Sequence, residues 1–231
     1  MADDKKILFV IPARRGSKRV HRKNIKNLAG KPLICWTIEA ALPLSEKNLI
    51  VVSSDDEEVL DISNRYKNKN LLAHKRPKEL ASDTSTTDSV VVDAALVAQQ
   101  YGFEPDTIVL LQPTSPLRKK ENIVEALQLF EKAGSVDSVV SVSEVDHPSV
   151  WIGAIDKNSI ISGLDLSGGR SQDHEKEYRL NGAIYVISAT FLMQKCKVFT
   201  PVLRAYVMPR EFSIDIDENM DFKIAESLFG M

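Results

Sequence analysis

The sequence has few of the residues that mark disulfide-bonded, zinc-binding or membrane proteins. Its 231 residues include two cysteines, Cys35 and Cys196, without metal-ligand spacing, which predicts reduced thiols in a cytoplasmic protein. The four histidines are scattered, and none has a partner spaced for a zinc site. No apolar run approaches the roughly 20 residues that span a bilayer, and no signal peptide precedes the first apolar run. We therefore expect a cytoplasmic protein that contacts no membrane.

An excess of charge of one sign is also absent. The 30 lysines and arginines are balanced by 32 aspartates and glutamates, so the net charge is −2. This balance produces no overall field that would attract nucleic acid. No internal repeat, low-complexity segment or second domain boundary is found, and a hydrophobic fraction of 43% suffices for a sizeable core. We expect residues 1–231 to form one domain.

Apolar runs and helical patterns alternate along the chain to about residue 145. The runs expected to form strands are 7–11, 49–52, 71–73, 106–111 and 136–142. A strand that is apolar throughout is typical of a parallel sheet buried on both faces. The order predicts an α/β fold in three layers, a mostly parallel sheet with helices on both faces. Farther along, 151–155 and 160–161 favour a hairpin, and 167–177 a mobile loop.

A basic loop directly follows the first predicted strand. Six cations lie between Arg14 and Lys23, with Gly16 and Ser17 among them. Such a cluster cannot be buried in a core, and ligands of α/β sheets bind at the carboxyl ends of the strands. Gly16 allows close approach of the backbone, and successive N–H groups can cradle an anion. We interpret this stretch as a polyphosphate-binding loop; a solvated basic turn is the alternative.

Two carboxylates near the C-terminus are a candidate metal site. Asp215 and Asp217 are two residues apart, so in a strand they would share one face. They would repel each other without a cation, and nothing nearby in sequence offers a counter-charge. Carboxylates, together with water and substrate phosphates, are usual ligands of Mg²⁺. The pattern favours Mg²⁺ over a surface pair without metal.

Three other positions have alternative interpretations. The run Ser54-Asp55-Asp56-Glu57 matches a capping box, with Asp55 as the helix cap rather than a ligand contact. The dipeptide Asn181-Gly182 taken alone indicates a turn. Beside it, Arg179 is a candidate for pairing with a substrate carboxylate, or a solvent-facing arginine.

Several motifs together resemble the cytidylyltransferases that activate nine-carbon sugar acids, the CMP-sialic acid synthetases and their legionaminic and pseudaminic acid relatives. The family pattern I-P-A-R-x-x-S-K-x-x-x-x-K-N is matched at 11–24, with unusual residues at Arg15 and His21. Further matches are R-P-x-x-L-A-x-D-x-x-[ST] at 76–86, within a hydroxyl-rich stretch, L-Q-P-T-S-P-x-R at 111–118, N-G-A-I-Y at 181–185 and S-I-D-I-D at 213–217. The resemblance covers almost the whole chain, in the family's order.

The resemblance implies a nucleotide-diphospho-sugar transferase-like fold and a homodimer, with 146–180 as the dimerisation and sugar-binding element. It implies transfer of CMP from CTP to the anomeric hydroxyl of a nonulosonic acid, with release of pyrophosphate. The nucleotide-binding residues that it implies are Arg14, Ser17, Lys18, Asn24, Arg76, Thr87 and Gln112. The sugar-binding residues are Gln112, Arg179 and Tyr185. The catalytic residues are Arg14, Lys23, Asp215 and Asp217, the last two as ligands of Mg²⁺.

An in-line attack at the α-phosphorus needs cations and positioning rather than a covalent intermediate. The base that takes the hydroxyl proton could be metal-bound hydroxide or one of the two aspartates. Two other functions are compatible with the sequence. One is a CMP-Kdo-type synthetase acting on a 3-deoxy-octulosonic acid, which shares the turn at 30–33 but lacks the ending Arg22-Lys23-Asn24. The other is a non-catalytic nucleotide-binding protein on the same fold.

Overall fold

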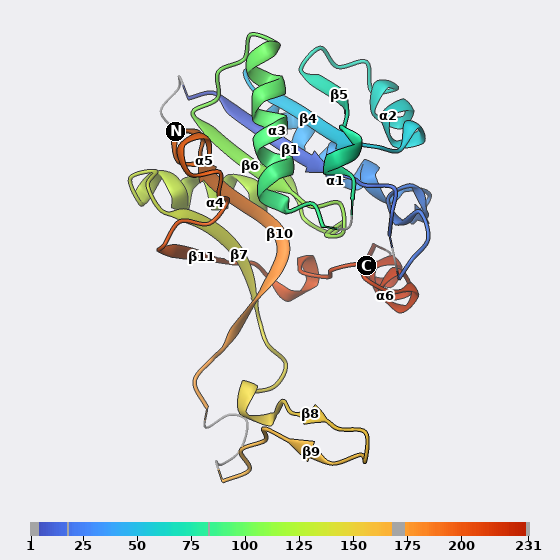
Figure 1. The fold of residues 1–231 in the computed structure, drawn as a ribbon, viewed down its shortest axis with the longest axis vertical. Coiled ribbons are helices and arrows are strands. Elements are labelled where there is room, and N and C mark those ends of the chain that lie inside the picture. The colour runs from blue at the N-terminus through green and yellow to red at the C-terminus, as the bar shows by residue number, and fades with distance from the viewer. Residues whose placement is uncertain (1–4, 18, 83, 168–173, 230–231) are drawn as a thin grey trace.

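A seven-stranded sheet forms the centre of the protein, in the order β11-β7-β10-β6-β1-β4-β5 (Figure 1). The computed structural model describes residues 5–17, 19–82, 84–167 and 174–229. The strands of the sheet are β1 (Ile7–Pro12), β4 (Leu49–Ser54), β5 (Leu71–Lys75), β6 (Thr107–Leu111), β7 (Ser138–Glu144), β10 (Tyr178–Ser188) and β11 (Leu203–Val207). The strands predicted from the apolar runs are all present.

Most neighbouring strands are parallel. Strand β1 pairs in parallel with β4 and β6, β4 with β5, and β7 with β11. Only β10 runs antiparallel, against both β6 and β7. The predicted mostly parallel sheet is therefore confirmed, and the one reversed strand is the strand that returns from the segment after β7.

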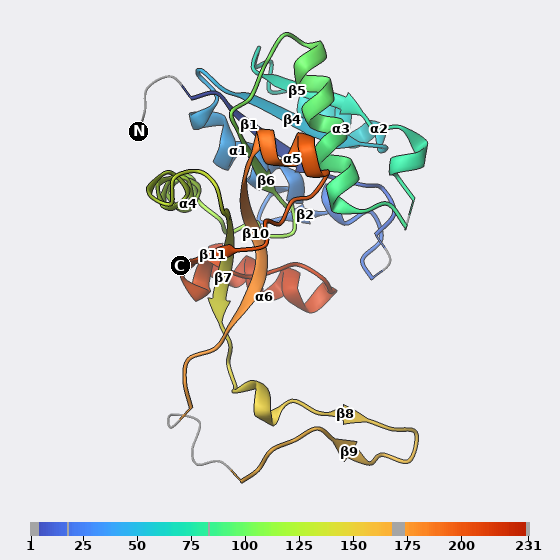
Figure 2. The same cartoon turned by 60° about the vertical axis from the view of Figure 1, so that its left-hand side comes forward.

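Helices cover both faces of the sheet, as predicted (Figure 2). They are α1 (Leu33–Ala41), α2 (Glu57–Asn64), α3 (Thr87–Gln100), α4 (Lys120–Lys132), α5 (Ala189–Lys195) and α6 (Asn219–Phe229). Alternate side chains of β1 point to opposite faces. Phe9 and Ile11 pack with α1, α2 and α4, whereas Leu8 and Val10 pack with α3 and α5. None of the helices in the described ranges is long and apolar enough to cross a membrane.

The C-terminal helix brings the end of the chain to the basic loop. Phe222 and Ala225 of α6 pack with Val20, Leu28 and Ile216 in a third apolar cluster. Leu28 belongs to a short hairpin of β2 (Asn27–Leu28) and β3 (Lys31–Pro32), which follows the 3-10 helix η1 (Lys23–Ile25). This packing places the carboxylates just before α6 beside the cations of the loop.

A hairpin arm projects from the body (Figures 1 and 2). It contains the 3-10 helix η4 (Ser149–Trp151) and the antiparallel strands β8 (Ala154–Ile155) and β9 (Ile161–Ser162), which confirms the predicted hairpin. Strands β7 and β10 continue together toward the arm, with Glu144 opposite Tyr178. Residues 168–173 of the predicted loop lie outside the described residues.

Candidate functional site

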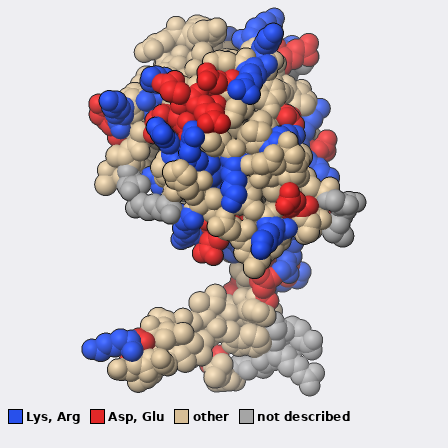
Figure 3. Space-filling view, turned by 90° about the vertical axis from the view of Figure 1, so that its right-hand side faces the viewer, with Lys and Arg blue, Asp and Glu red and all other residues tan. Residues whose placement is uncertain are grey.

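A cavity of about 510 Å³ opens at the carboxyl ends of the parallel strands. Its lining comes from the ends of β1 and β5, the turn after β6, the basic loop and the N-terminus of α3. Lysine and arginine side chains gather on the corresponding face of the body (Figure 3). The residues that line the cavity are Pro12, Arg14, Ser17, Arg19, Val20, Lys23, Asn24, Arg76, Leu80, Ser82, Ser85, Thr86, Thr87, Val90, Gln112, Pro113, Thr114 and Asp217.

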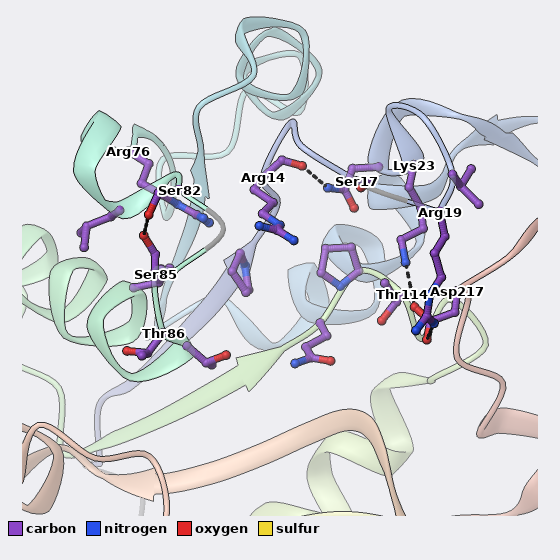
Figure 4. Close-up of a pocket in the computed structure, with 18 residues that line it drawn as sticks. Arg14, Ser17, Arg19, Lys23, Arg76, Ser82, Ser85, Thr86, Thr114 and Asp217 are labelled. Atoms are coloured by element: carbon purple, nitrogen blue, oxygen red, sulfur yellow. Dashed lines mark hydrogen bonds and ion pairs between the residues drawn. The ribbon is translucent and has the colours of Figure 1, made fainter. Parts of the chain in front are cut away.

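The cavity has two chemically different ends (Figure 4). Arg76 and the hydroxyl groups of Ser82, Ser85 and Thr86 lie at one end. The other end holds Arg19, Lys23, Thr114 and Asp217, and Arg14 lies between the two ends. An uncharged hydrogen-bonding group and a polyanion could therefore bind side by side in this cavity.

Backbone contacts hold the basic loop in shape. The Asn24 side chain, which is 8% exposed, donates from Nδ2 to the carbonyl of Arg14 at 3.0 Å. Asp55 Oδ1 accepts from the Arg15 backbone N–H at 2.8 Å. Asn24 was predicted to bind the nucleotide, and this bond shows that part of its hydrogen-bonding capacity holds the loop instead.

The predicted helix cap at Asp55 is wrong by one residue. Asp56 precedes α2 in an extended conformation, and its carboxylate accepts from the backbone N–H of Glu58. Arg22 of the basic loop donates to the same Asp56 carboxylate at 2.9 and 3.1 Å and pairs with Glu58 at 3.0 Å. Asp56 first, and Glu58 after it, raise the pKa of Arg22. This cation is thus directed to the start of α2.

The two candidate metal ligands have different surroundings. They do not lie in a strand, as the alternation had indicated, but in a segment that joins no sheet of the described chain. Asp217 is paired by Arg19 at 2.8 Å and by Lys23 at 3.3 Å. Neither cation is near Asp217 in the sequence, as expected; both reach it because α6 packs this segment against the basic loop.

Asp215 is half-buried and less well satisfied. Burial raises its pKa, a hydrogen bond from Thr114 opposes the rise, and the charge of Asp217 adds to it. Asp215 Oδ1 is buried without a hydrogen-bond partner among the described residues. A cation would relieve both the orphaned oxygen and the repulsion between the carboxylates. The donor set therefore fits Mg²⁺, although no group of three or more Asp, Glu, His or Cys side chains gathers anywhere in the described chain.

Arg76 is the buried cation at the end of the cavity that holds the hydroxyl groups. Its Nε donates to Ser53 Oγ at 3.1 Å and its Nη2 to the Ser53 carbonyl at 2.8 Å. These bonds to β4 fix the guanidinium, and burial lowers its pKa. Nearby, Thr86 caps α3 by accepting from the Ser89 backbone N–H, which leaves Thr87 as the first helical residue, at the cavity wall.

Gln112 lies against Gly182 of β10, a residue without a side chain. Gly182 has a φ of +75°, and a Cβ built on it would come within 2.8 Å of Gln112 Oε1 and 3.8 Å of Asp215 Oδ2. Arg118, which is 2% exposed, connects the turn after β6 to β10. It donates to the carbonyls of Gln112 at 3.1 Å and Ala183 at 2.7 Å. The two predicted site residues thus converge on one glycine.

Three of the predicted residues that the structure describes do not line the cavity: Asp215, Arg179 and Tyr185. Tyr185 is 7% exposed, and its ring packs against Phe199 with the ring centroids 5.7 Å apart. Arg179 is exposed, and its charge acts on Asp215 by lowering the pKa of that carboxyl. Lys18 lies outside the described residues. Sequence reasoning did not assign roles to five lining residues, Arg19, Ser82, Ser85, Thr86 and Thr114, although all five lie in the polar stretches that it had noted.

Comparison with known proteins gives a consistent set of relatives. A family model described as "Cytidylyltransferase" matches residues 8–227. The chain is 36% identical to an N-acylneuraminate cytidylyltransferase of Escherichia coli, over 95% of this chain but 51% of that protein. It is 37% identical to a CMP-N,N'-diacetyllegionaminic acid synthase of Legionella pneumophila, over 98% and 97% of the two chains. It is 32% identical to a pseudaminic acid cytidylyltransferase of Campylobacter jejuni, over 97% and 96%.

Solved structures share the fold at lower identity. One is a CMP:2-keto-3-deoxy-manno-octonic acid synthetase complexed with CTP, with a TM-score of 0.67 at 17% identity, covering 98% of this chain and 99% of the other. Another is a 4-diphosphocytidyl-2C-methyl-D-erythritol synthase from Anaerococcus prevotii, with a TM-score of 0.66 at 11% identity, covering 99% and 100%. Both likenesses concern the fold alone.

Proposed function

Because the chain belongs to the cytidylyltransferase family, we propose that it transfers CMP from CTP to the anomeric hydroxyl of a nonulosonic acid and releases pyrophosphate. The observation that carries this proposal is the two-ended cavity. A base fits at the end with Arg76 and the hydroxyl groups, and a triphosphate fits along Arg14, Lys23 and Arg19 (Figure 4). The substrates that relatives' names specify, neuraminic, legionaminic and pseudaminic acids, support the class of acceptor.

Electrostatic stabilisation is the main contribution of the chain to this reaction. The attack on the α-phosphorus moves negative charge onto the leaving pyrophosphate, and fixed cations stabilise that charge. Arg14 lies in the middle of the cavity, and Lys23 is 12% exposed at the far end. Asn24 holds the backbone of Arg14, so that this cation is positioned before the nucleotide arrives.

Asp215 and Asp217 would hold Mg²⁺ in this proposal. When bound, the metal supplies Lewis-acid polarisation of the α-phosphate. Lys23 binds both the Ile216 carbonyl and Asp217, so the cationic end of the loop and the carboxylates form one unit. Since Arg19 and Lys23 pair with Asp217, a triphosphate that attracts these cations would free the carboxylate for the metal.

The sugar acid would bind between Gln112 and the base of the arm. Gln112 faces the cavity beside Asp215, and Arg179 offers a guanidinium for the carboxylate of the substrate. Tyr185, being buried, would shape this place from behind rather than contact the sugar through an exposed hydroxyl. The arm would complete the site in a homodimer, since it projects away from the body of its own chain (Figure 1).

A pyrophosphate-release assay tests the function. The protein is incubated with CTP, Mg²⁺ and each of neuraminic, legionaminic, pseudaminic and 3-deoxy-octulosonic acids, and UTP replaces CTP in a parallel series. We expect turnover with CTP and a nine-carbon acid, and much less with UTP, whose 4-carbonyl and N3–H reverse the hydrogen-bonding pattern of cytosine. Turnover with the eight-carbon acid alone would indicate the CMP-Kdo-type activity. Absence of turnover with every acid, despite CTP binding, would indicate a non-catalytic nucleotide-binding protein.

A further inference from the structure

Asn181 is a fully buried polar side chain behind the candidate site. It is 1% exposed, and its amide group has partners on three segments of the chain. Oδ1 accepts from Ser141 Oγ of β7 at 2.6 Å and from the Ala183 backbone N–H at 3.2 Å. Nδ2 donates to Ser213 Oγ at 3.0 Å. A side chain with these partners is directed into the protein and not toward a substrate.

The donors and acceptors around Asn181 form a directed chain. The Ile184 backbone N–H donates to Ser141 Oγ at 2.8 Å, which leaves the Ser141 hydroxyl proton for Asn181 Oδ1. The Ser213 hydroxyl donates to the Pro209 carbonyl at 2.8 Å, which leaves a Ser213 lone pair for Asn181 Nδ2. The Ala183 N–H identifies Oδ1 as the acceptor, so the orientation of the amide is determined by its contacts.

The segment that Asn181 holds has no strand neighbour. Residues 213–217 lie outside every strand of the described chain, so the ladder bonds that usually fix an extended segment are missing there. Asp215 lies between two anchored residues instead. Ser213 is held by Asn181, and the Ile216 N–H donates to the Thr114 carbonyl at 2.7 Å while its side chain is fully buried.

We propose that Asn181 is a positioning residue that fixes Asp215 through Ser213 in the orientation required for the metal. This inference rests on the proposed metal-binding role of Asp215. Outer hydrogen-bond partners of a metal ligand set its direction without touching the ion. Asn181 acts one step farther out, through the backbone that joins Ser213 to Asp215. The position of Gly182 supports the assignment, because the missing side chain there leaves the space in which Asp215 and Gln112 converge.

The test measures metal affinity separately from nucleotide affinity. Mn²⁺ serves as the probe, and its binding is followed by electron paramagnetic resonance in the presence of CTP. CTP binding is measured by calorimetry in EDTA, and the melting temperature of each protein by circular dichroism. The variants are Asn181→Ala and Ser213→Ala. Replacing an outer partner of a metal ligand typically weakens metal binding about 10–100-fold, and we expect this loss for Mn²⁺ with CTP binding in EDTA changed less than about twofold.

The matched control is Asn122→Ala. Asn122 is 4% exposed on α4, where its side chain bonds the Tyr206 hydroxyl at 3.2 Å and the Lys119 N–H at 2.9 Å. This variant loses a comparably buried amide and should bind Mn²⁺ as the wild type does. Equal weakening by Asn122→Ala, or normal Mn²⁺ affinity in folded Asn181→Ala or Ser213→Ala, would overturn the proposal. If Asn181→Ala does not fold, the Mn²⁺ affinity of Ser213→Ala tests the proposal. A wild type that binds no Mn²⁺ with CTP would overturn the metal assignment itself.

Discussion

At the scale of single residues, the cations of the basic loop differ in what they contact. Arg22 pairs with the start of α2, Arg19 and Lys23 pair with Asp217, and Arg14 lies in the middle of the cavity. A run of similar residues in the sequence thus contains residues that shape the loop and residues that line the cavity. The difference comes from neighbouring elements, because α2 and the segment before α6 offer the carboxylates.

The first prediction concerns Arg14. Arg14→Ala removes a cation from the middle of the cavity, and we expect turnover to fall about 10²–10³-fold, the usual cost of one donor to a developing charge. The melting temperature should stay close to that of the wild type, since the side chain belongs to a loop. Steady-state pyrophosphate release measures the effect. Arg15→Ala is the control, because Arg15 is exposed and its link to Asp55 is through the backbone; equal losses in both variants would contradict the assignment.

The second prediction separates the two aspartates by stability. Because the pKa of Asp215 is raised chiefly by burial, its charged form destabilises the folded, metal-free protein. Asp215→Asn should therefore melt higher at neutral pH, on the order of 2–4 °C for each kcal/mol gained. Below the usual pKa of an aspartate the carboxyl is protonated in both the folded and the unfolded protein, so the advantage should vanish. It should grow as the pH rises above that usual value and level off above the raised pKa of the folded protein.

Asp217→Asn is the comparison for that experiment. Asp217 is exposed and already paired by Arg19 and Lys23, and exposed ion pairs contribute about 0–1 kcal/mol. Its replacement should leave the melting temperature unchanged or slightly lower in EDTA. Calorimetry of both variants between acid and neutral pH measures the difference. A stabilising effect of Asp217→Asn larger than that of Asp215→Asn would show that the two environments are assigned the wrong way round.

At the scale of elements, β10 is the strand that connects the site to the arm. Its register moves from Leu180 opposite Val142 to Tyr185 opposite Val140, so β10 advances five residues while β7 advances two. The irregularity covers residues 181–184 and includes Asn181 and Gly182, which the sequence alone had indicated as a turn. Because parallel sheets need long crossovers whereas antiparallel neighbours do not, β10 can return directly from the arm.

The third prediction tests this irregularity. Gly182→Ala places a Cβ at positive φ and within 2.8 Å of Gln112 Oε1. A left-handed conformation costs a non-glycine residue roughly 1–2 kcal/mol, so the melting temperature should fall, and displacement of Gln112 should lower turnover further. Thermal melts and steady-state kinetics report both effects. Gly134→Ala on the loop after α4 is the control, since it has φ +78° with open space around it; it should lose stability but keep its turnover.

At the scale of the whole molecule, the arm exposes apolar side chains that a free surface would not favour. The exposed fractions are 65% for Ile152, 71% for Ile155, 62% for Ile160 and 74% for Leu166. Leaving aside the residues drawn in grey, most of the arm in Figure 3 is tan and therefore neither acidic nor basic. Apolar surface of this kind marks an interface, and a second copy of the chain in a two-fold dimer would bury it.

The fourth prediction is that the arm carries the dimer. Ile155→Glu should shift sedimentation equilibrium at micromolar concentration toward the monomer, because a charge would have to be buried against the partner. Turnover should fall with it if the arm completes the site. Leu96→Glu on α3, at a side chain that is 43% exposed on the body, is the control and should remain a dimer. A fully active wild-type monomer would contradict both the dimer and the role of the arm.

Hydrophobic periodicity and clustered charge are local properties, so the α/β class, the strands of the apolar runs and the basic loop could be predicted before the fold was known. The family motifs are local as well. The contacts of the residues within those motifs could not be predicted in this way. Asp217 gained its counter-charges from residues 198 and 194 positions away, and Asn181 reaches Ser141 and Ser213 across 40 and 32 positions. Such partners depend on how α6, β7 and β10 pack, and the spacing of residues along the chain does not predict that packing.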